Sequence, residues 1–135
     1  MKTNKLERIL ELHEKWLNGE EGGERADLSH ADLSGADLRE ANLCHVDLSH
    51  TDLSDADLRG ADLREADLDY SCLPLWCGSL SANFDDRQLK QIAYHLVKAG
   101  LQSKNASEET KTELRKLIPF ANGFHRAEEC GFIME

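Results

Sequence analysis

The chain has 135 residues, a formal net charge of −10 and a hydrophobic content of 40%. These values fit a compact domain and disfavour direct binding to nucleic acid or to an anionic membrane, because like charges repel. The apolar runs span only a few residues, and the first eight residues lack the apolar stretch of a signal peptide, so we expect a cytoplasmic protein that neither crosses nor binds a membrane.

The first segment, residues 1–25, is predicted to be a capping helix followed by a turn. Asn18-Gly19 is a typical helix end, and Gly22-Gly23 lies in the turn that leads onward. We assign the apolar side chains to the packing of a lid and not to ligand binding. They recur at helical spacing over residues 4–17: Leu6, Ile9, Leu10, His13, Trp16 and Leu17.

Residues 26–75 consist of ten consecutive five-residue units, of which the last, SCLPL, is weak. A spacing of five puts Leu neither on one face of a helix nor on one face of a strand, so the chain must turn once per unit. Such a fixed period is typical of a solenoid, whose units bury their apolar side chains by stacking. The third position is Leu throughout: Leu28, Leu33, Leu38, Leu43, Leu48, Leu53, Leu58, Leu63, Leu68 and Leu73.

The pattern A(D/N)LXX resembles that of the pentapeptide-repeat family. The resemblance implies a mainly β solenoid: a short right-handed quadrilateral β-helix of about two and a half coils, with four units to a coil. Leu and the small residue two positions before it should point inward. Coils ~4.8 Å apart would then make a rod of roughly 10 to 12 Å.

Stacking the units by twenties divides the outward residues into four faces. Face one is built from the units that begin at residues 26, 46 and 66, and face two from those that begin at 31, 51 and 71. Neither contains Lys or Arg, and we call them the acidic faces. His30, His50 and Tyr70 share one corner column. Faces three and four, the arginine faces, set Asp37, Glu40, Asp57, Asp62 and Glu65 against Arg39, Arg59 and Arg64. Seven candidate partner-binding residues follow on the acidic faces: Asp27, Asp32, Asp47, Asp52, Asp55, Asp67 and Asp69.

These aspartates allow two interpretations. In the first, the Asp before each Leu accepts hydrogen bonds from backbone N–H groups of the turn and serves only the fold. In the second, the carboxylates imitate DNA phosphates, which recur every ~3.4 Å along each strand, and bind a basic protein. Asp55 and Asp69 lie outside the motif position, so the first interpretation does not cover them.

The resemblance also implies a function for the acidic faces. Well-understood pentapeptide-repeat proteins imitate B-DNA, protect or inhibit DNA gyrase and dimerise into a long rod. This chain is much shorter and is similar to small members carried by phages and prophages. We therefore expect a non-enzymatic DNA mimic that inhibits a basic host protein, such as gyrase or a defence protein. The alternative is an interaction scaffold or homodimer that acts through the C-terminal helical end.

The third segment, residues 76–135, is predicted to be helical, and Pro74 should end the solenoid because it cannot donate a ladder hydrogen bond. Asp85 or Asp86 can cap a helix that ends near Gly100, with Leu89, Ile92, Ala93, Leu96 and Val97 on its apolar face. Ser107 should start a second helix that buries Leu114, Leu117 and Ile118 and ends or kinks at Pro119. A third helix is expected over residues 120–130.

Candidate chemistry is sparse. Cys72, Cys77, His125 and Cys130 could supply four zinc ligands if they met in space, and His30 with His50 could bind a metal beside Asp32 or Asp52. We favour free thiols and a solvated histidine column, hence no metal and no cofactor. The sequence contains no P-loop, no G-x-S-x-G and no zinc-protease motif, so we expect no enzymatic activity.

Overall fold

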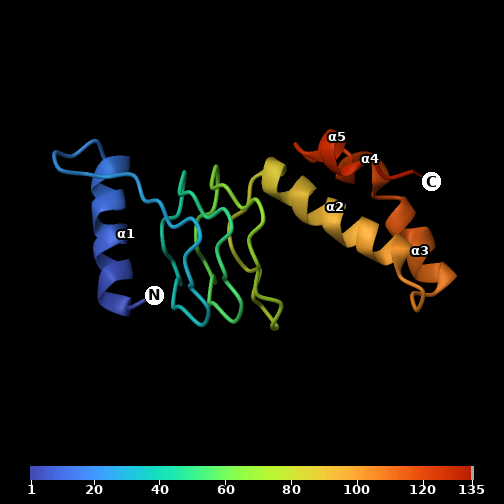
Figure 1. Cartoon of the computed structure of the whole chain (residues 1–135), viewed down its shortest axis with the longest axis horizontal. Helices are drawn as coiled ribbons and strands as arrows, with labels where there is room; N and C mark the ends of the chain where they lie inside the picture. The colour runs from blue at the N-terminus through green and yellow to red at the C-terminus, as the bar shows by residue number, and fades with distance from the viewer. Residues whose placement is uncertain (135) are drawn as a thin grey trace. The chain divides into compact units, whose positions relative to one another are not determined.

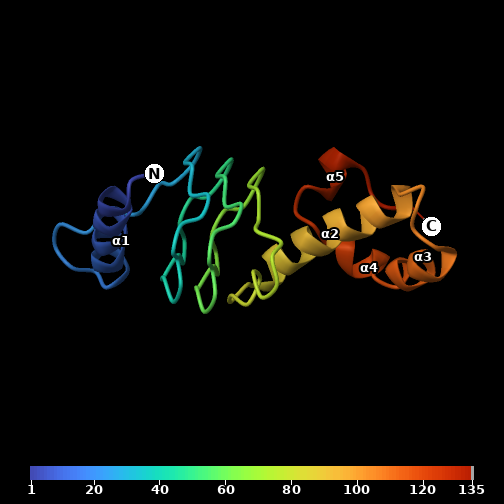
Figure 2. The ribbon, with the colours of Figure 1, turned by 90° about the horizontal axis from the view of Figure 1, so that it is seen from below.

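The computed structural model describes residues 1–134 and consists of two units, Met1–Phe84 and Asp85–Glu135. The first unit holds helix α1 (Thr3–Leu17) and the stacked repeats, and the second holds four helices. Figures 1 and 2 show the repeats as successive loops, with α1 beside the first of them.

The repeats stack by twenties, as predicted. Parallel bridges join Asp27 to Asp47 and Asp47 to Asp67, and equivalent bridges occur on the other three faces. The backbone hydrogen bonds have the same period: the Leu28 N–H donates to the Asp47 carbonyl at 2.8 Å, and the Asp52 N–H donates to the Ala31 carbonyl at 3.0 Å. Four units therefore make one coil.

The strand content is lower than a mainly β fold would have, because within the described residues each bridge stands alone. Each unit turns immediately after its Leu. The Ala31 N–H donates to the Leu28 carbonyl at 3.1 Å, and His30, the third residue of that turn, has a φ of 59°. A turn every five residues leaves only the residue before Leu extended enough to pair, so no ladder longer than one residue forms.

The interior of the first unit is a column of leucines and small residues. Leu28 to Leu68 are all buried, and Val46, Thr51, Ala56, Ala61 and Ala66 fill the positions two residues before them. Thr51 is the polar member of this set, and its hydroxyl donates to the Leu28 carbonyl at 2.8 Å. The predicted inward positions are thus confirmed.

The stack continues beyond residue 75, where we expected the solenoid to end. Asn83 pairs with Asp62 at a step of twenty-one residues, and Ala82 and Phe84 pack on the leucine core as an Ala and a Leu of a regular unit would. The extra residue lies in a loop on face three. There the Trp76 side chain donates Nε1–H to the Ala56 carbonyl at 3.0 Å, in the position of the missing backbone donor. The unit boundary accordingly falls after Phe84.

Helix α1 covers the open end of the first coil. Leu6 is buried against the leucine core, and Ile9 and Leu10 pack on it. The helix ends at Asn18 and Gly19, as predicted, and the returning chain crosses it closely at Gly23. A Cβ on Gly23 would overlap the backbone of Trp16, so only glycine fits at this crossing.

The second unit is a small helical assembly: α2 (Asp86–Gln102), α3 (Glu108–Arg115), α4 (Ile118–Ala121) and α5 (Ala127–Cys130). Asp85 and Ser107 cap α2 and α3, as predicted, and the cap of α2 is a capping box with Gln88. The core, which α2 shares with the segments that follow α3, comprises Tyr94, Val97, Ile118, Ala121, Phe124, Ala127 and Ile133.

Three helix boundaries differ from the predictions. Helix α2 does not end at Gly100 but runs through it to Gln102; this glycine makes room for Leu114, which occupies the space that a Cβ there would need. Pro119 sits in the first turn of α4, where a missing N–H costs little, instead of ending α3. The helix expected over residues 120–130 is two helices, since the chain turns at Gly123.

The apolar face predicted for α2 is divided between the two sides of the helix. Val97 is buried and Ala93 packs on the core, whereas Leu89 and Leu96 are 42% and 53% exposed. Leu117, which we expected to be buried, is 40% exposed. Leu89, Ile92 and Leu96 thus form an apolar stripe along α2, next to the side that carries the core residues Tyr94 and Val97.

Candidate functional site

Every aspartate before a repeat leucine uses Oδ1 to close its own turn. On the acidic faces, Asp47 Oδ1 accepts from the Ser49 N–H at 2.9 Å and from the Ser49 hydroxyl at 2.6 Å. Asp27, Asp32 and Asp52 bind Ser29, Ser34 and Ser54 in the same way. Asp67 accepts from the Asp69 N–H at 2.9 Å. The turn-closing interpretation is therefore correct for these side chains.

This role occupies one of the two carboxylate oxygens. Within residues 1–134, no hydrogen bond or ion pair involves Oδ2 of Asp27, Asp32, Asp47 or Asp52. Turn closure therefore uses Oδ1 and leaves Oδ2 without a hydrogen bond or ion pair in this part of the chain. Hydrogen bonds from the Ser29 hydroxyl and N–H lower the pKa of Asp27, and those from Ser34 lower the pKa of Asp32, so both stay ionised at neutral pH.

The arginine faces use the same turn, but there an arginine neutralises the aspartate that closes it. Arg39 follows Leu38 where Ser follows Leu on the acidic faces, and its Nη2 lies 2.8 Å from Asp37 Oδ2. Its Nε also lies 3.8 Å from Asp57 Oδ2 in the next coil. Arg59 and Arg64 bind Asp57 and Asp62 through Oδ2 at 2.6 Å.

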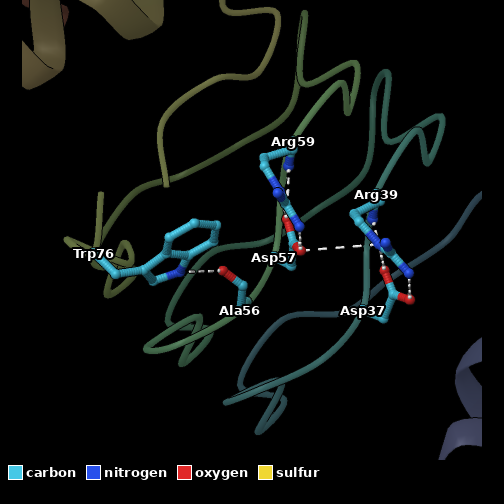
Figure 3. Close-up of polar contacts among 6 residues, drawn as sticks. All are labelled: Asp37, Arg39, Ala56, Asp57, Arg59 and Trp76. Carbon is cyan, nitrogen blue, oxygen red and sulfur yellow. Dashed lines mark hydrogen bonds and ion pairs between the residues drawn. The ribbon is translucent and has the colours of Figure 1, made fainter. Parts of the chain in front are cut away.

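Figure 3 shows the ladder that results on face three, in which Asp37, Arg39, Asp57 and Arg59 follow one another up the stack. The last arginine of this ladder, Arg59, packs on Trp76: its guanidinium carbon lies 5.5 Å from the centroid of the Trp76 ring. The hydrogen bond from Arg39 lowers the pKa of Asp37 to about 2. Asp37, Asp57 and Asp62 are therefore each paired with an arginine, whereas the repeat units of the acidic faces contain no Lys or Arg.

His30, His50 and Tyr70 form the predicted corner column. The His30 and His50 rings stack with centroids 4.5 Å apart, and those of His50 and Tyr70 are 4.7 Å apart. All three residues have a φ near 60°, the conformation of the turn's third position. The lone pair of a ring nitrogen lies in the plane of its ring, and near-parallel planes do not meet at one ion, so His30 and His50 are not arranged as a pair of metal ligands.

The remaining candidates are distributed as follows. Asp55 is exposed at the third position of its turn, with a φ of 58°. The four proposed zinc ligands divide between the units: Cys72 and Cys77 belong to the first, His125 and Cys130 to the second. Among the described residues, no three His, Cys, Asp or Glu side chains are arranged to hold a metal ion.

No helix of the described chain is long and apolar enough to span a membrane.

Comparison with known families identifies the stacked segment. Residues 24–60 and 45–74 match the family described as pentapeptide repeats, with 8 copies. Residues 24–74 are pentapeptide repeats. The coil of four units per twenty residues is thus the architecture of a pentapeptide-repeat segment, to which α1 and the second unit are added.

This chain is also similar to solved structures. A pentapeptide repeat protein (Rfr23) from the cyanobacterium Cyanothece 51142 is 36% identical over 44% of this chain, with a TM-score of 0.35. The match spans 36% of that protein. No curated protein matches this chain.

Proposed function

We propose that this protein binds a basic protein through its acidic faces, in the place that DNA would occupy, and that it acts without catalysis. The observation that carries the proposal is the Oδ2 contrast between the faces. Oδ2 of Asp27, Asp32, Asp47 and Asp52 makes no ion pair within the described residues, whereas Asp37, Asp57 and Asp62 are paired with arginines through Oδ2.

Row geometry supports a DNA-like target. The carboxylates of Asp27, Asp47 and Asp67 repeat once per coil, at the ~4.8 Å spacing of neighbouring strands. Phosphates repeat every ~3.4 Å along one DNA strand. We propose that a groove whose Lys and Arg side chains bind a row of phosphates also binds this row of carboxylates. Because two acidic faces adjoin at the corner column of His30, His50 and Tyr70, they present two parallel rows, as two DNA strands do.

The small size limits the kind of partner. The pentapeptide repeats provide about three levels of carboxylates, roughly 10 to 12 Å of rod, which corresponds to a few base pairs. We therefore propose a compact basic site, such as the DNA-contacting groove of gyrase or of a host defence protein, engaged over a short distance. A longer contact would require two copies placed end to end.

The proposal is tested by removing charge without removing the turn. Asn42 shows how, since its Oδ1 accepts the Cys44 N–H at 3.2 Å as aspartates do elsewhere. In the acidic-face variant, four aspartates become Asn: Asp27→Asn, Asp47→Asn, Asp52→Asn and Asp67→Asn. The matched control makes the same change of charge on the arginine faces: Asp37→Asn, Glu40→Gln, Asp57→Asn and Asp62→Asn.

Each protein is immobilised and exposed to bacterial lysate and, separately, to purified DNA gyrase. We expect the wild type and the control to retain basic proteins that elute as salt is raised, because screening shortens the range of exposed charges. The acidic-face variant should retain them at least tenfold less. Retention of the same proteins by that variant would contradict the proposal.

The exposed stripe of α2 favours a second candidate, a scaffold or homodimer that acts through the C-terminal unit. Leu89 and Leu96 are large apolar side chains that the core leaves in solvent. The double variant Leu89→Ser, Leu96→Ser separates the two functions. A loss of partner capture or of a dimer, measured by light scattering, would assign the interaction to α2, whereas unchanged behaviour would leave it with the acidic faces.

A further inference from the structure

His13 connects α1 to the first coil at two points. The ring is fully buried, with 0% of its surface exposed. Its Nδ1 accepts a hydrogen bond from the Ala26 N–H at 3.0 Å, and its Nε2 lies 2.8 Å from the Cys44 carbonyl oxygen. The two partners are far apart in sequence and belong to the first and fourth units of that coil.

These partners fix the protonation state of the ring. A backbone N–H can only donate, so Nδ1 must carry a lone pair, and a carbonyl can only accept, so Nε2 must carry the proton. The geometry therefore requires a neutral imidazole protonated at Nε2. A second proton at Nδ1 would point directly at the Ala26 N–H and remove that hydrogen bond.

The hydrogen bond from His13 to the Cys44 carbonyl takes the place of one that a preceding coil would donate. One coil further along the stack, the Arg64 carbonyl, which is the counterpart of the Cys44 carbonyl, accepts from the His45 N–H at 3.2 Å. The first coil has no coil before it, and His13 supplies the donor instead. The terminal amine of Met1 similarly donates to the Asp32 carbonyl on the same open edge. Helix α1 and the residue Met1 before it thus bind backbone carbonyls of the first coil that have no preceding coil to pair with.

The surroundings oppose protonation of His13. Burial is the main cause that lowers the pKa of this ring, and the nearby charges of Arg25 and His45 lower it further, while the hydrogen bond to Cys44 acts in the opposite direction. Arg25 donates to the His45 carbonyl at 2.7 Å, and its guanidinium carbon lies 6.0 Å from the centroid of the Trp16 ring. On α1 itself, the Trp16 ring stacks on His13 with centroids 5.5 Å apart. No carboxylate is among the groups that shift this pKa.

We propose that His13 is a proton-operated latch, which holds α1 on the pentapeptide repeats while its ring is neutral and releases the helix when the ring takes up a proton at Nδ1. Release separates Leu6, Ile9 and Leu10 from the leucines of the first coil and opens the apolar end of the stack. The proposal concerns the end of the repeats and is independent of what the acidic faces bind.

The pH window follows from linkage. The released state takes up a proton near the ordinary histidine pKa of ~6.5, whereas the latched state does so only at lower pH. The latch therefore contributes its full stability above pH ~6.5 and loses it as the pH falls below that value. At pH 5.5, one unit lower, the opening equilibrium should rise about tenfold, provided that the latched ring is still neutral.

Hydrogen exchange of the full chain at pH 7.5 and 5.5, corrected for the intrinsic effect of pH, tests the latch. We expect exchange of the α1 amides in the wild type to rise about tenfold at pH 5.5. The amides of α2 serve as an internal reference and should not change. An unchanged α1 in the wild type would overturn the proposal without any variant.

Two variants identify the residue responsible. His13→Asn should raise α1 exchange at pH 7.5 and abolish its pH response, whereas His45→Asn, which removes a neighbouring histidine outside the two hydrogen bonds, should keep the response. If His13→Asn retained the full pH response, or if His45→Asn alone abolished it, another group would be the sensor and the proposal would be wrong. Should His13→Asn unfold, the wild type and His45→Asn still decide between these outcomes.

Discussion

The acidic faces and the arginine faces are made from the same five-residue unit, yet their surface charge differs. Both bury Leu, both close a turn on an Asp Oδ1, and both stack at twenty-residue intervals. They differ at the residue after Leu, where Ser49 leaves Oδ2 of Asp47 unmatched and Arg59 neutralises Oδ2 of Asp57. The comparison teaches that one solvent-facing position sets the charge of a face while the fold stays the same.

The largest expected effect tests whether the two kinds of face share one core. Leu53→Ala lies on an acidic face and Leu58→Ala on an arginine face, and both side chains are 0% exposed. Each should lower the free energy of unfolding by about 2 to 5 kcal/mol, from lost burial and the cavity left behind. Leu75→Ala is the control, since Leu75 is 88% exposed and should change stability by less than ~0.5 kcal/mol.

Chemical denaturation measures all three variants. A loss below ~1 kcal/mol at either buried position would refute the inward assignment for that face. Losses within the expected range at both positions would agree with one core shared by the two kinds of face.

A smaller effect separates the two functions of one carboxylate. Asp52→Ala removes the acceptor of the Ser54 N–H and should cost about 0.5 to 1.5 kcal/mol, whereas Asp52→Asn keeps the acceptor and should stay within ~0.5 kcal/mol of the wild type. The midpoints of urea unfolding measure both. Equal losses for the two variants would show that charge, and not turn closure, is what Asp52 contributes to stability.

Replacing the arginine of one unit by the serine of an acidic-face unit should lower the free energy of unfolding by a smaller amount. Arg64→Ser turns an arginine unit into the Ser type and breaks an ion pair whose arginine is exposed, so stability should fall by less than ~1 kcal/mol. Thermal unfolding at low salt checks this. A loss above 2 kcal/mol would mean that the arginines hold the repeats together and do not merely neutralise them.

The smallest effect is a pH dependence. The folded pKa of Asp37 is lowered to about 2 from an ordinary value of 3.8, so its contribution to stability is present above pH ~3.8 and is lost as the pH falls toward 2. Replacing it, in Asp37→Asn, should flatten the fall of the melting temperature between pH 4 and 2. An identical pH profile for the variant and the wild type would show that the Arg39 pair is absent in solution.

The sequence predicts those features of the fold that its period encodes. A Leu at every fifth residue requires a turning, stacked chain, and Asp85 and Ser107 are recognisable helix caps. The continuation to Phe84 escaped prediction because the period is broken by a loop and Phe replaces Leu. The exposure of Leu89 and Leu96 was missed because α2 is apolar on two sides, and periodicity does not tell which side is covered.

Part of the candidate site was also visible in the sequence. The acidic rows and the corner column follow from counting by twenties, and the structure places Asp27, Asp47 and Asp67 in one row as expected. The different contacts of Oδ1 and Oδ2 depend on rotamers and distances, which a sequence does not contain. Their signal was nevertheless present in the residue after Leu, which is Ser in four units of the acidic faces and Arg in three units of the arginine faces.

The central claim is that the acidic faces take the place of DNA on a basic partner, and displacement of duplex measures this directly. A fluorescently labelled duplex is bound to the captured partner, and its anisotropy is followed as this protein is added. We predict that the wild type and the arginine-face control displace the duplex, and that the variant with Asn at positions 27, 47, 52 and 67 does not. Displacement by that variant at the concentration at which the wild type acts would contradict the claim.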